Sequence, residues 1–383
     1  MDLKAAAQAH FTTIQSQMIA LSHRIHAHPE LGFEEEHAST WLAETLSDHG
    51  FSVTKGICDL PTAFMAQAGS GPLHLALCAE YDSLPGIGHA CGHNIIAAMA
   101  LGAGIATAAL ADDLGLSVHV IGTPVEEMGG GGKILLLERG AFAGMHAAMM
   151  VHPSPTDNIT PVTLANTYFE VRYTGKEAHA ASFPERGVNA ADAMTVAQVA
   201  IGLLRQHIRS TDRIHGIVTK GGDAPNVIPA HTAAKYAVRA QTIEELDDIR
   251  AKVRRCFEAG ALATGASLDI TGESKPYAQL RHDPAMAAAY HRNATALGRD
   301  LPPLSAPPHP GGSTDMGNVS QALPSIHPMI GIDSLPASNH QPEFAAHCIT
   351  EAADRAIRDG ALAMAWTAID LATDASLRTS LLG

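Results

Sequence analysis

The stretch LHLALCAEYDSLPGIGHACGHN, residues 73–94, joins a short apolar run to a loop that is rich in polar side chains. Its first seven residues have the length and composition of a buried strand. Glu80 and Asp82 follow this run directly, and Cys91 and His93 stand one residue apart further along the loop. Thiolate and imidazole are standard ligands of zinc, and a neighbouring carboxylate can complete such a set. The stretch therefore predicts a strand that carries metal-type ligands beyond its carboxyl end.

Two further apolar runs show the same pattern. LSVHVIG, residues 116–122, is followed by Glu126 and Glu127, and HAAMMV, residues 146–151, is followed by His152. Short apolar runs separated by helical stretches are typical of a largely parallel α/β sheet. Because ligands bind beyond the carboxyl ends of the strands in such sheets, we expect the three runs to bring these side chains to one edge.

The pattern changes after about residue 165. Strands are expected at 167–175, 214–222, 231–240 and 266–273, and helices at 189–208 and 243–263. This β-α-β-β-α-β order is that of a ferredoxin-like unit. After it the chain passes through a Pro/Gly loop, residues 301–317, and ends in a long helix from about Ala345.

The fold class follows from these elements. We predict an α/β protein whose main domain has a mixed, largely parallel sheet and is built from residues 1–165 and 276–383. Residues 166–275 form an inserted ferredoxin-like α+β domain.

Composition and charge exclude several classes of protein. The 39 acidic and 25 basic residues give a formal charge of -14, which argues against a nucleic-acid partner and against an anionic membrane surface. The first 30 residues have no apolar core of a signal peptide, and the apolar run from Ile95 to Ala111 is short and rich in small residues, as in a buried helix. The five cysteines are scattered, which favours reduced thiols over a disulfide framework. We therefore expect a cytoplasmic enzyme.

Taken singly, the candidate ligands have ordinary interpretations. Two adjacent glutamates in a loop are usually a solvated pair, a lone cysteine is usually a buried apolar thiol, and most of the 22 histidines are expected to be structural or exposed. Their joint placement favours a hydrolytic metal site, which needs a carboxylate ligand and a second carboxylate to take a proton from water. Adjacent side chains on an extended stretch diverge, so Glu126 and Glu127 could divide these roles.

Two other interpretations fail on spacing. The glycine run after the acid pair is not a phosphate loop, because Glu127 and Ile134 stand where a Walker motif requires Gly and Ser or Thr. These glycines instead indicate a tight turn before a helix. Cys91 has no C-x-x-C partner, which argues against a redox dithiol.

The chain resembles the M20 family of metal-dependent aminoacylases and carboxypeptidases, in particular the amidohydrolase branch with Cys in the metal motif. The resemblance covers nearly the whole chain in family order. It rests on HPELGFEE (28–35), EYDSLPGIGHACGHN (80–94), GTPVEEMGGGGK (122–133), VHPSP (151–155), GKEAHAA (175–181), NVIP (226–229), GGSTDMG (311–317) and SNHQPEF (338–344).

The resemblance implies a binuclear metal site. Cys91 would bridge two divalent ions, His93 and His152 would bind one, and Glu127 and His340 would bind the other. Zinc is the first expectation for such ligands, with manganese, cobalt or nickel as alternatives.

The resemblance also implies catalytic roles for three residues. Glu126 would be the general base, and Asp82 would orient a metal ligand. The inserted domain would act as a lid and as the interface of a homodimer, and His179 would reach into the partner's site to stabilise the oxyanion.

Four further residues match positions that hold substrate in the family. Asn226 and Arg239 would bind the substrate's carboxylate, for which a guanidinium is well suited, although Arg239 could also be an ordinary surface charge of a strand. Gly312 and Ser313, in the GGSTDMG stretch, are the other two candidates.

Two departures from the common motif bear on the substrate. The chain has Glu80-Tyr81-Asp82 in place of Asp-x-Asp, and Asn94 ends the cysteine motif. Both features look like the subgroup that includes p-aminobenzoyl-glutamate hydrolase and the aminoacylase-1-like dipeptidase. We therefore expect an amidohydrolase of N-acyl amino acids, with a dipeptidase and a catalytically silent metal-binding protein as alternatives.

Overall fold

The computed structural model describes residues 2–304 and 312–383. Residues 305–311, within the expected Pro/Gly loop, lie outside this description. The chain forms two compact units: Met1–Val162 together with Leu280–Gly383, and Thr163–Gln279.

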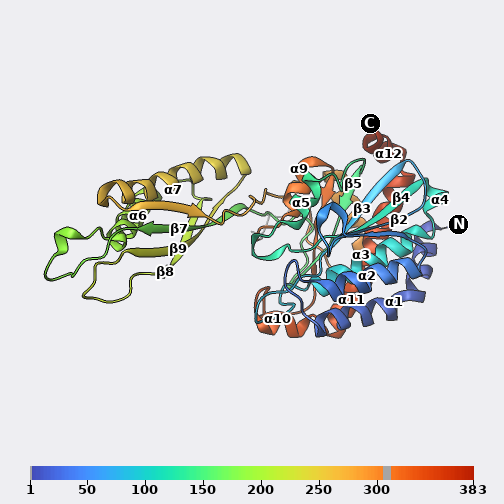
Figure 1. The fold of residues 1–383 in the computed structure, drawn as a ribbon. Helices are drawn as coiled ribbons and strands as arrows, with labels where there is room; N and C mark the ends of the chain where they lie inside the picture. The colour runs from blue at the N-terminus through green and yellow to red at the C-terminus, as the bar shows by residue number, and fades with distance from the viewer. Residues whose placement is uncertain (1, 305–311) are drawn as a thin grey trace. The chain divides into compact units, whose positions relative to one another are not determined.

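A six-stranded mixed sheet forms the centre of the first unit (Figure 1). Its strands, in spatial order, are β1 (Ser52–Lys55), β2 (Phe64–Ala68), β4 (Leu116–Gly122), β3 (Leu73–Ala79), β5 (Ala147–Met149) and β11 (Ser325–Ile326). The last four strands are mutually parallel, and β1 and β2 complete the sheet in antiparallel fashion. The three apolar runs of the sequence are thus β3, β4 and β5, and the expectation of a mixed, largely parallel sheet is confirmed.

The third run is shorter than expected. β5 ends at Met149, and His152 begins a separate strand, β6 (His152–Ser154), which pairs in parallel with β12 (Met329–Gly331). His152 therefore lies on a short strand beyond the run and not in a loop, because its backbone pairs with that of Met329.

Helices pack around the sheet of this unit. They are α1 (Leu3–Ala27), α2 (Glu36–Asp48), α3 (His93–Ala108), α4 (Ala111–Leu114), α5 (Gly132–Glu138), α8 (Pro284–Ala296), α9 (Met316–Ala322), α10 (Pro342–His347), α11 (Glu351–Thr373) and α12 (Ala375–Leu382). Two short 3₁₀ turns, η1 (Ile57–Asp59) and η2 (Glu127–Gly129), lie between them.

The apolar run near residue 100 is the most enclosed of these helices. α3 packs on β3 and β4, and α1 and α11 pack on α3 in turn. Every residue from His93 to Thr107 is buried as a result. The rest of the first unit thus buries this helix, as its small residues predicted. No helix of residues 2–304 and 312–383 is long and apolar enough to cross a membrane. The cytoplasmic location stays a prediction.

The expected long C-terminal helix is interrupted. α10 ends at His347, and α11 begins after Thr350, whose hydroxyl accepts a hydrogen bond from the amide of Ala353. Such a side-chain cap satisfies an amide that has no partner within the helix, and it starts a new helix here.

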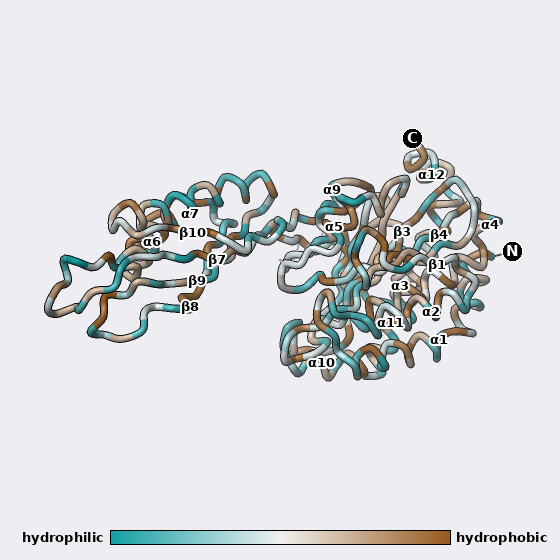
Figure 2. The backbone as a smooth tube through the Cα atoms, in the orientation of Figure 1, coloured by the Kyte–Doolittle hydropathy of each residue, from teal (hydrophilic) through white to brown (hydrophobic). Residues whose placement is uncertain are grey.

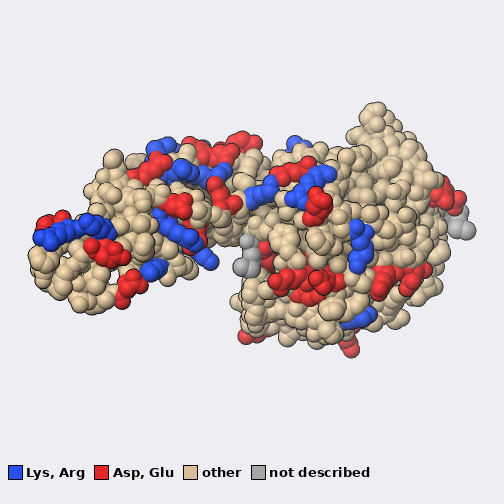
Figure 3. All heavy atoms as spheres, viewed as in Figure 1, with Lys and Arg blue, Asp and Glu red and all other residues tan. Residues whose placement is uncertain are grey.

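The second unit is a four-stranded antiparallel sheet with two helices. In chain order it contains β7 (Ala165–Thr174), η3 (Pro184–Arg186), α6 (Ala190–Leu204), η4 (Arg205–His207), β8 (Arg213–Lys220), β9 (His231–Ala240), α7 (Ile243–Thr264) and β10 (Ser267–Thr271). The sheet order is β10-β7-β9-β8, which with this chain order gives a ferredoxin-like arrangement. The amphipathic pattern of α7 explains why this helix packs on the sheet. A stripe of residues from Leu246 to Gly260 is buried at helical spacing, and the rest of the helix is largely hydrophilic (Figure 2). Acidic and basic side chains are interspersed on the face of this unit seen in Figure 3.

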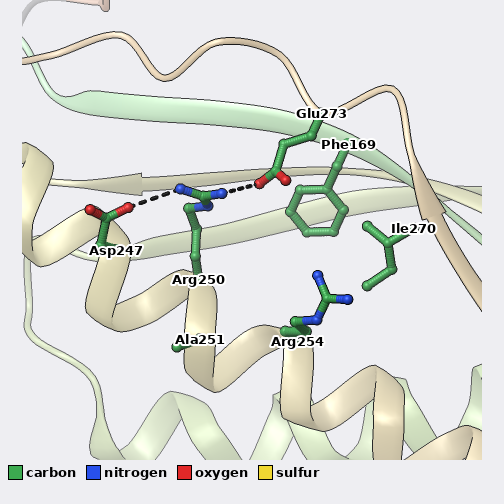
Figure 4. Close-up of a pocket in the computed structure, with 7 residues that line it drawn as sticks. All are labelled: Phe169, Asp247, Arg250, Ala251, Arg254, Ile270 and Glu273. Atoms are coloured by element: carbon green, nitrogen blue, oxygen red, sulfur yellow. Dashed lines mark hydrogen bonds and ion pairs between the residues drawn. The ribbon is translucent and has the colours of Figure 1, made fainter.

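A pocket of about 220 Å³ opens between α7 and the sheet of the second unit (Figure 4). Arg250 pairs there with Asp247 at 2.9 Å and with Glu273. The remaining arginine, Arg254, pairs with Glu258 at 3.2 Å. Since both guanidinium groups already have carboxylate partners, the pocket itself indicates no ligand.

Candidate metal centre

The five predicted metal ligands come from four segments of the first unit. Cys91 lies in the loop after β3, and His93 is the first residue of α3. Glu127 opens η2 after β4, His152 begins β6, and His340 lies in the loop before α10. The ends of the strands thus gather side chains that are up to 249 positions apart, from Cys91 to His340.

The ligand atoms form two sets that share one thiol. Those of Cys91, His93 and His152 lie within 4.8 Å of one another, and those of Cys91, Glu127 and His340 do the same. The Cys91 Sγ is 3.4 Å from His152 Nε2, and a Glu127 carboxylate oxygen is 3.4 Å from His340 Nε2. Two further groups of this kind include Glu126: one with His93 and Glu127, and one with Glu80 and Asp315. The assignment of the ligands to two ions stays a prediction.

One side of the centre is open to solvent. The His340 side chain is 56% exposed, whereas the other four ligands are buried. The backbone of His340 has φ of 68°, and its amide donates a hydrogen bond to the carbonyl of Ala90 at 2.8 Å. The loop that carries His340 is therefore tied to the loop that carries the thiol.

Asp82 forms a hydrogen bond with one candidate ligand of each set. One carboxylate oxygen accepts a hydrogen bond from His93 Nδ1 at 2.9 Å, and the other accepts from the amide of Glu127 at 2.9 Å. Burial alone would raise the pKa of Asp82, but His93 and these hydrogen bonds outweigh it, so its pKa lies below the ordinary value. Because Nδ1 is used in this way, His93 presents Nε2 to the centre.

His152 is held in the same tautomer by the backbone. Its Nδ1 donates to the carbonyl of Pro153 at 2.7 Å, so that Nε2 faces the thiol. Burial lowers the pKa of His152 to about 4, and the ring is neutral at pH 7, as a metal ligand must be.

The donor set fits divalent cations. Among the described residues, His93 Nε2, Glu80 Oε2 and Glu127 Oε1 are buried and have no hydrogen bond of good geometry. Their nearest polar partners are long contacts within the centre, His93 Nε2 to Glu80 Oε2 and His340 Nε2 to Glu127 Oε1, both at 3.4 Å. A bound cation would satisfy these atoms better. Around them, five carboxyl groups are buried: those of Glu80, Asp82, Glu126, Glu127 and Asp315. Bound cations would compensate this excess of buried acid.

A buried lysine, which the sequence reasoning missed, neutralises part of this charge. Lys133 Nζ lies 2.5 Å from Glu80 and 2.6 Å from Asp315, and its amide also donates to Asp315 at 2.8 Å. Both Asp315 and Lys133 are fully buried. The sequence carries one signal of this role, a lysine at the start of the apolar helix GKILLLE. The carboxylates of Glu80, Glu126 and Asp315 thus have an ammonium group beside them.

Glu126 lies beside the two ligand sets. Its carboxylate is 3.9 Å from His93 Nε2. Burial, and then the charges of Glu80, Glu127 and Asp315, raises the pKa of Glu126 well above its ordinary value. Its φ of -73° and ψ of -40° are helical, so the interpretation of the acid pair as an extended stretch was wrong. An oxygen of each carboxylate nevertheless faces the same ring, at 3.9 Å and 4.0 Å from His93 Nε2.

The candidates His179, Asn226 and Arg239 belong to the second unit. His179 and Asn226 are exposed and lie on neighbouring loops, because the amide of Ala180 donates to the Asn226 carbonyl at 3.0 Å. Arg239 lies on β9, half-buried, and donates to the hydroxyl of Tyr168 at 3.0 Å. The structure thus brings the first two together within this unit.

Gly312 and Ser313 lie just before Asp315, which pairs with the buried Lys133. Gly312 is exposed and Ser313 is half-buried, whereas Thr314 and Asp315 are buried. Residues 312–315 therefore lead from the surface of the first unit to its buried centre.

A family model matches most of the chain. Residues 76–358 match the model of peptidase family M20/M25/M40. The chain belongs to this family.

Relatives of this M20 protein hydrolyse peptide or amide bonds. It is 38% identical to the Xaa-Arg dipeptidase of Mus musculus over 386 residues, which covers 96% of this chain and 89% of the relative. It is 33% identical to one of the chains of the p-aminobenzoyl-glutamate hydrolase of Escherichia coli K12 over 270 residues, 65% of this chain and 56% of the relative. This M20 protein is thus a hydrolase of amides or peptides.

Solved structures share the fold of this M20 protein. The YXEP protein of Bacillus subtilis, a dinuclear metal-binding M20 peptidase, aligns with a TM-score of 0.71 at 21% identity over 94% of this chain and 99% of its own. A putative aminohydrolase of methicillin-resistant Staphylococcus aureus aligns with a TM-score of 0.76 at 20% identity over 94% of this chain and 99% of its own.

Proposed function

We propose that this protein is a binuclear metal-dependent amidohydrolase that removes an acyl group from an amino acid with a free carboxylate. The observation that carries the proposal is the pair of ligand sets that share Cys91, with the Glu126 carboxylate beside them. Cys91, His93 and His152 would hold one ion, and Cys91, Glu127 and His340 the other. Zinc suits the thiolate and imidazoles, and manganese, cobalt or nickel could replace it.

Bound ions would polarise the scissile carbonyl and lower the pKa of the attacking water. Glu126 accepts the proton of that water and returns it to the leaving amine, a role for which its buried carboxylate beside the ligand sets is placed. Asp82 keeps His93 and Glu127 in place during this exchange. His179 would stabilise the oxyanion, and Asn226 and Arg239, with Gly312 and Ser313, would hold the substrate.

A dipeptide is the second candidate substrate, and the 38% identity to a Xaa-Arg dipeptidase favours it. Gly-Arg and N-acetylarginine form a matched pair, because they differ only in the amino group of the acyl part. Cleavage of N-acetylarginine supports the amidohydrolase, and cleavage of Gly-Arg alone supports the dipeptidase. Hippurate and p-aminobenzoyl-glutamate extend the test to aromatic acyl groups.

Both candidates require the free carboxylate of the substrate. We expect that converting it to an amide lowers kcat/KM by about two orders of magnitude or more, because the groups that bind it lose their partner. The assay compares Gly-Arg and N-acetylarginine with their arginine amides. Equal hydrolysis of the acids and the amides would contradict a carboxylate clamp.

Replacing Cys91 by serine is expected to remove roughly half or more of the bound metal, because both ligand sets lose their shared thiolate. Metal per chain is measured by plasma mass spectrometry after reconstitution with zinc. Cys58→Ser is the control, since this thiol is free and half-buried outside the centre. Full metal content in Cys91→Ser would show that the thiol is not a ligand.

We further propose that the protein is a homodimer that pairs through the second unit. Strand β8 is an edge strand, and its Ile217 and Val218 are exposed, as are Val199 and Leu203 of α6. An exposed apolar edge strand offers backbone groups and apolar surface to a second copy. A symmetric pairing of this kind would let each protomer present His179 to its partner.

A further inference from the structure

The residue before the proposed base has an unusual backbone. Val125 has φ of 50°, in the left-handed region that β-branched residues rarely adopt. It joins β4, through Thr123 and Pro124, to Glu126 and η2. The conformation of this one residue therefore sets the direction in which both glutamates leave the sheet.

Two glycines leave room for the Val125 side chain. A Cβ on Gly32 would lie 2.4 Å from Val125 Cγ2, and a Cβ on Gly130 would lie 2.0 Å from the same atom. Neither distance is attainable for real side chains, so both positions require glycine. The Val125 carbonyl also accepts a hydrogen bond from the amide of Gly132 at 3.3 Å. The turn is thus enclosed on several sides, and Val125 is 6% exposed.

A buried carboxyl group holds the amide of the same residue. Glu35 has no exposed surface, and its Oε1 accepts a hydrogen bond from the Val125 amide at 2.8 Å. Its Oε2 accepts from the hydroxyl of Thr62 at 2.9 Å, and the Thr62 carbonyl accepts from the hydroxyl of Tyr81 at 2.6 Å. Tyr81 lies between Glu80 and Asp82, so Glu35 connects the turn at Val125 with the loop after β3.

The burial of Glu35 is not explained by an ion pair. Among the described residues, its side chain contacts a backbone amide and a hydroxyl but forms no ion pair with a lysine or an arginine. Burial, and then the charge of Asp82, raises the pKa of Glu35 to about 7. Burying a carboxyl group without an ionic partner costs free energy of folding, and the hydrogen bonds of Glu35 to Val125 and Thr62 are what it gains in return.

We propose that Glu35 is a positioning residue: by holding the amide of Val125 in the left-handed turn, it fixes the directions of Glu126 and Glu127. The effect on turnover rests on the proposed function, in which these two side chains are the base and a metal ligand. The effect on the turn itself does not.

Three variants test the proposal. Glu35→Ala removes the acceptor of the Val125 amide. Glu35→Gln keeps an amide oxygen as acceptor and can donate to the Thr62 hydroxyl. Glu34→Ala is the matched control, because Glu34 is an exposed glutamate of the same segment.

Two readouts separate positioning from a general loss of structure. We expect Glu35→Ala to speed hydrogen exchange in residues 123–132 and to lower kcat by about two orders of magnitude with little change in KM, as misplaced catalytic groups do. Glu35→Gln is expected to restore slow exchange and most of kcat, and Glu34→Ala to match the parent protein in both.

The proposal is overturned if Glu35→Ala leaves exchange in this segment unchanged, or if Glu35→Gln is as impaired as Glu35→Ala. A fall in kcat that matches only the fraction of unfolded protein would also overturn it. If the parent protein hydrolyses none of the panel, the proposed function fails, and the exchange data alone decide the role of Glu35.

Discussion

Replacing Glu126 by glutamine is expected to lower kcat by about 10²- to 10⁴-fold while the bound metal stays unchanged. Glutamine has the shape of glutamate but cannot accept the proton of the attacking water. The Glu126 side chain is buried next to the ligand sets and belongs to neither of the two that share Cys91. Steady-state hydrolysis and a metal count on the same sample test both halves of this expectation. Glu44→Gln, an exposed position on α2, is the control for the substitution itself.

Turnover that persists in Glu126→Gln would mean that another group takes the proton. Loss of metal together with loss of turnover would instead make Glu126 a ligand. Because His179 is proposed to act across a dimer, mixing inactive Glu126→Gln chains with inactive His179→Ala chains should restore part of the activity. Failure of that rescue, with mixed dimers shown to form, would remove the role of His179 in the partner's site.

Replacing Lys133 by methionine is expected to cost about 3–5 kcal/mol of stability, because removing one partner of a buried ionic network leaves the others uncompensated. The ammonium lies between Glu80 and Asp315, and all three side chains are fully buried. Urea unfolding in the presence of a chelator measures the effect without a contribution from metal. The two tryptophans, Trp41 and Trp366, both lie in the first unit, so their fluorescence reports that unit alone.

Two comparisons complete the Lys133 test. Lys252→Met, at a partly exposed ion pair on α7 in the second unit, is expected to leave the transition where it is. Adding Glu80→Gln to Lys133→Met is expected to recover part of the loss, because one of the uncompensated charges is then gone. A small effect of Lys133→Met alone would show that the two carboxyl groups bind a proton or water in its place.

The gathering of the ligands could be predicted because it follows from the architecture. Apolar runs such as residues 73–79 and 116–122 are visible in the sequence as buried strands, and the carboxyl ends of parallel strands meet at one edge of a sheet. Cys91, His93 and Glu127 stand just beyond such runs. Their convergence needed only the order of the strands, and the family resemblance supplied His340.

Contacts between distant residues could not be predicted in this way. Lys133 and Asp315 are 182 positions apart, and nothing near either residue in the chain indicates its partner. The turn at Val125 is equally hidden, because its left-handed backbone depends on Gly32 and Glu35, some 90 positions earlier. Tertiary packing overrides local preference at these sites, and local preference is what a sequence pattern records.

The order in which the chain is made has a consequence for the two units. The ferredoxin-like unit is one continuous segment, and all of it has been synthesised once Gln279 leaves the ribosome. The first unit needs both of its segments, since α11 packs on α1 and α3, and His340 is the last of the five candidate ligands along the chain. Domains fold as they are completed. The second unit is therefore expected to fold during synthesis before the first, whose five candidate ligands come together only once His340 has been added to the chain.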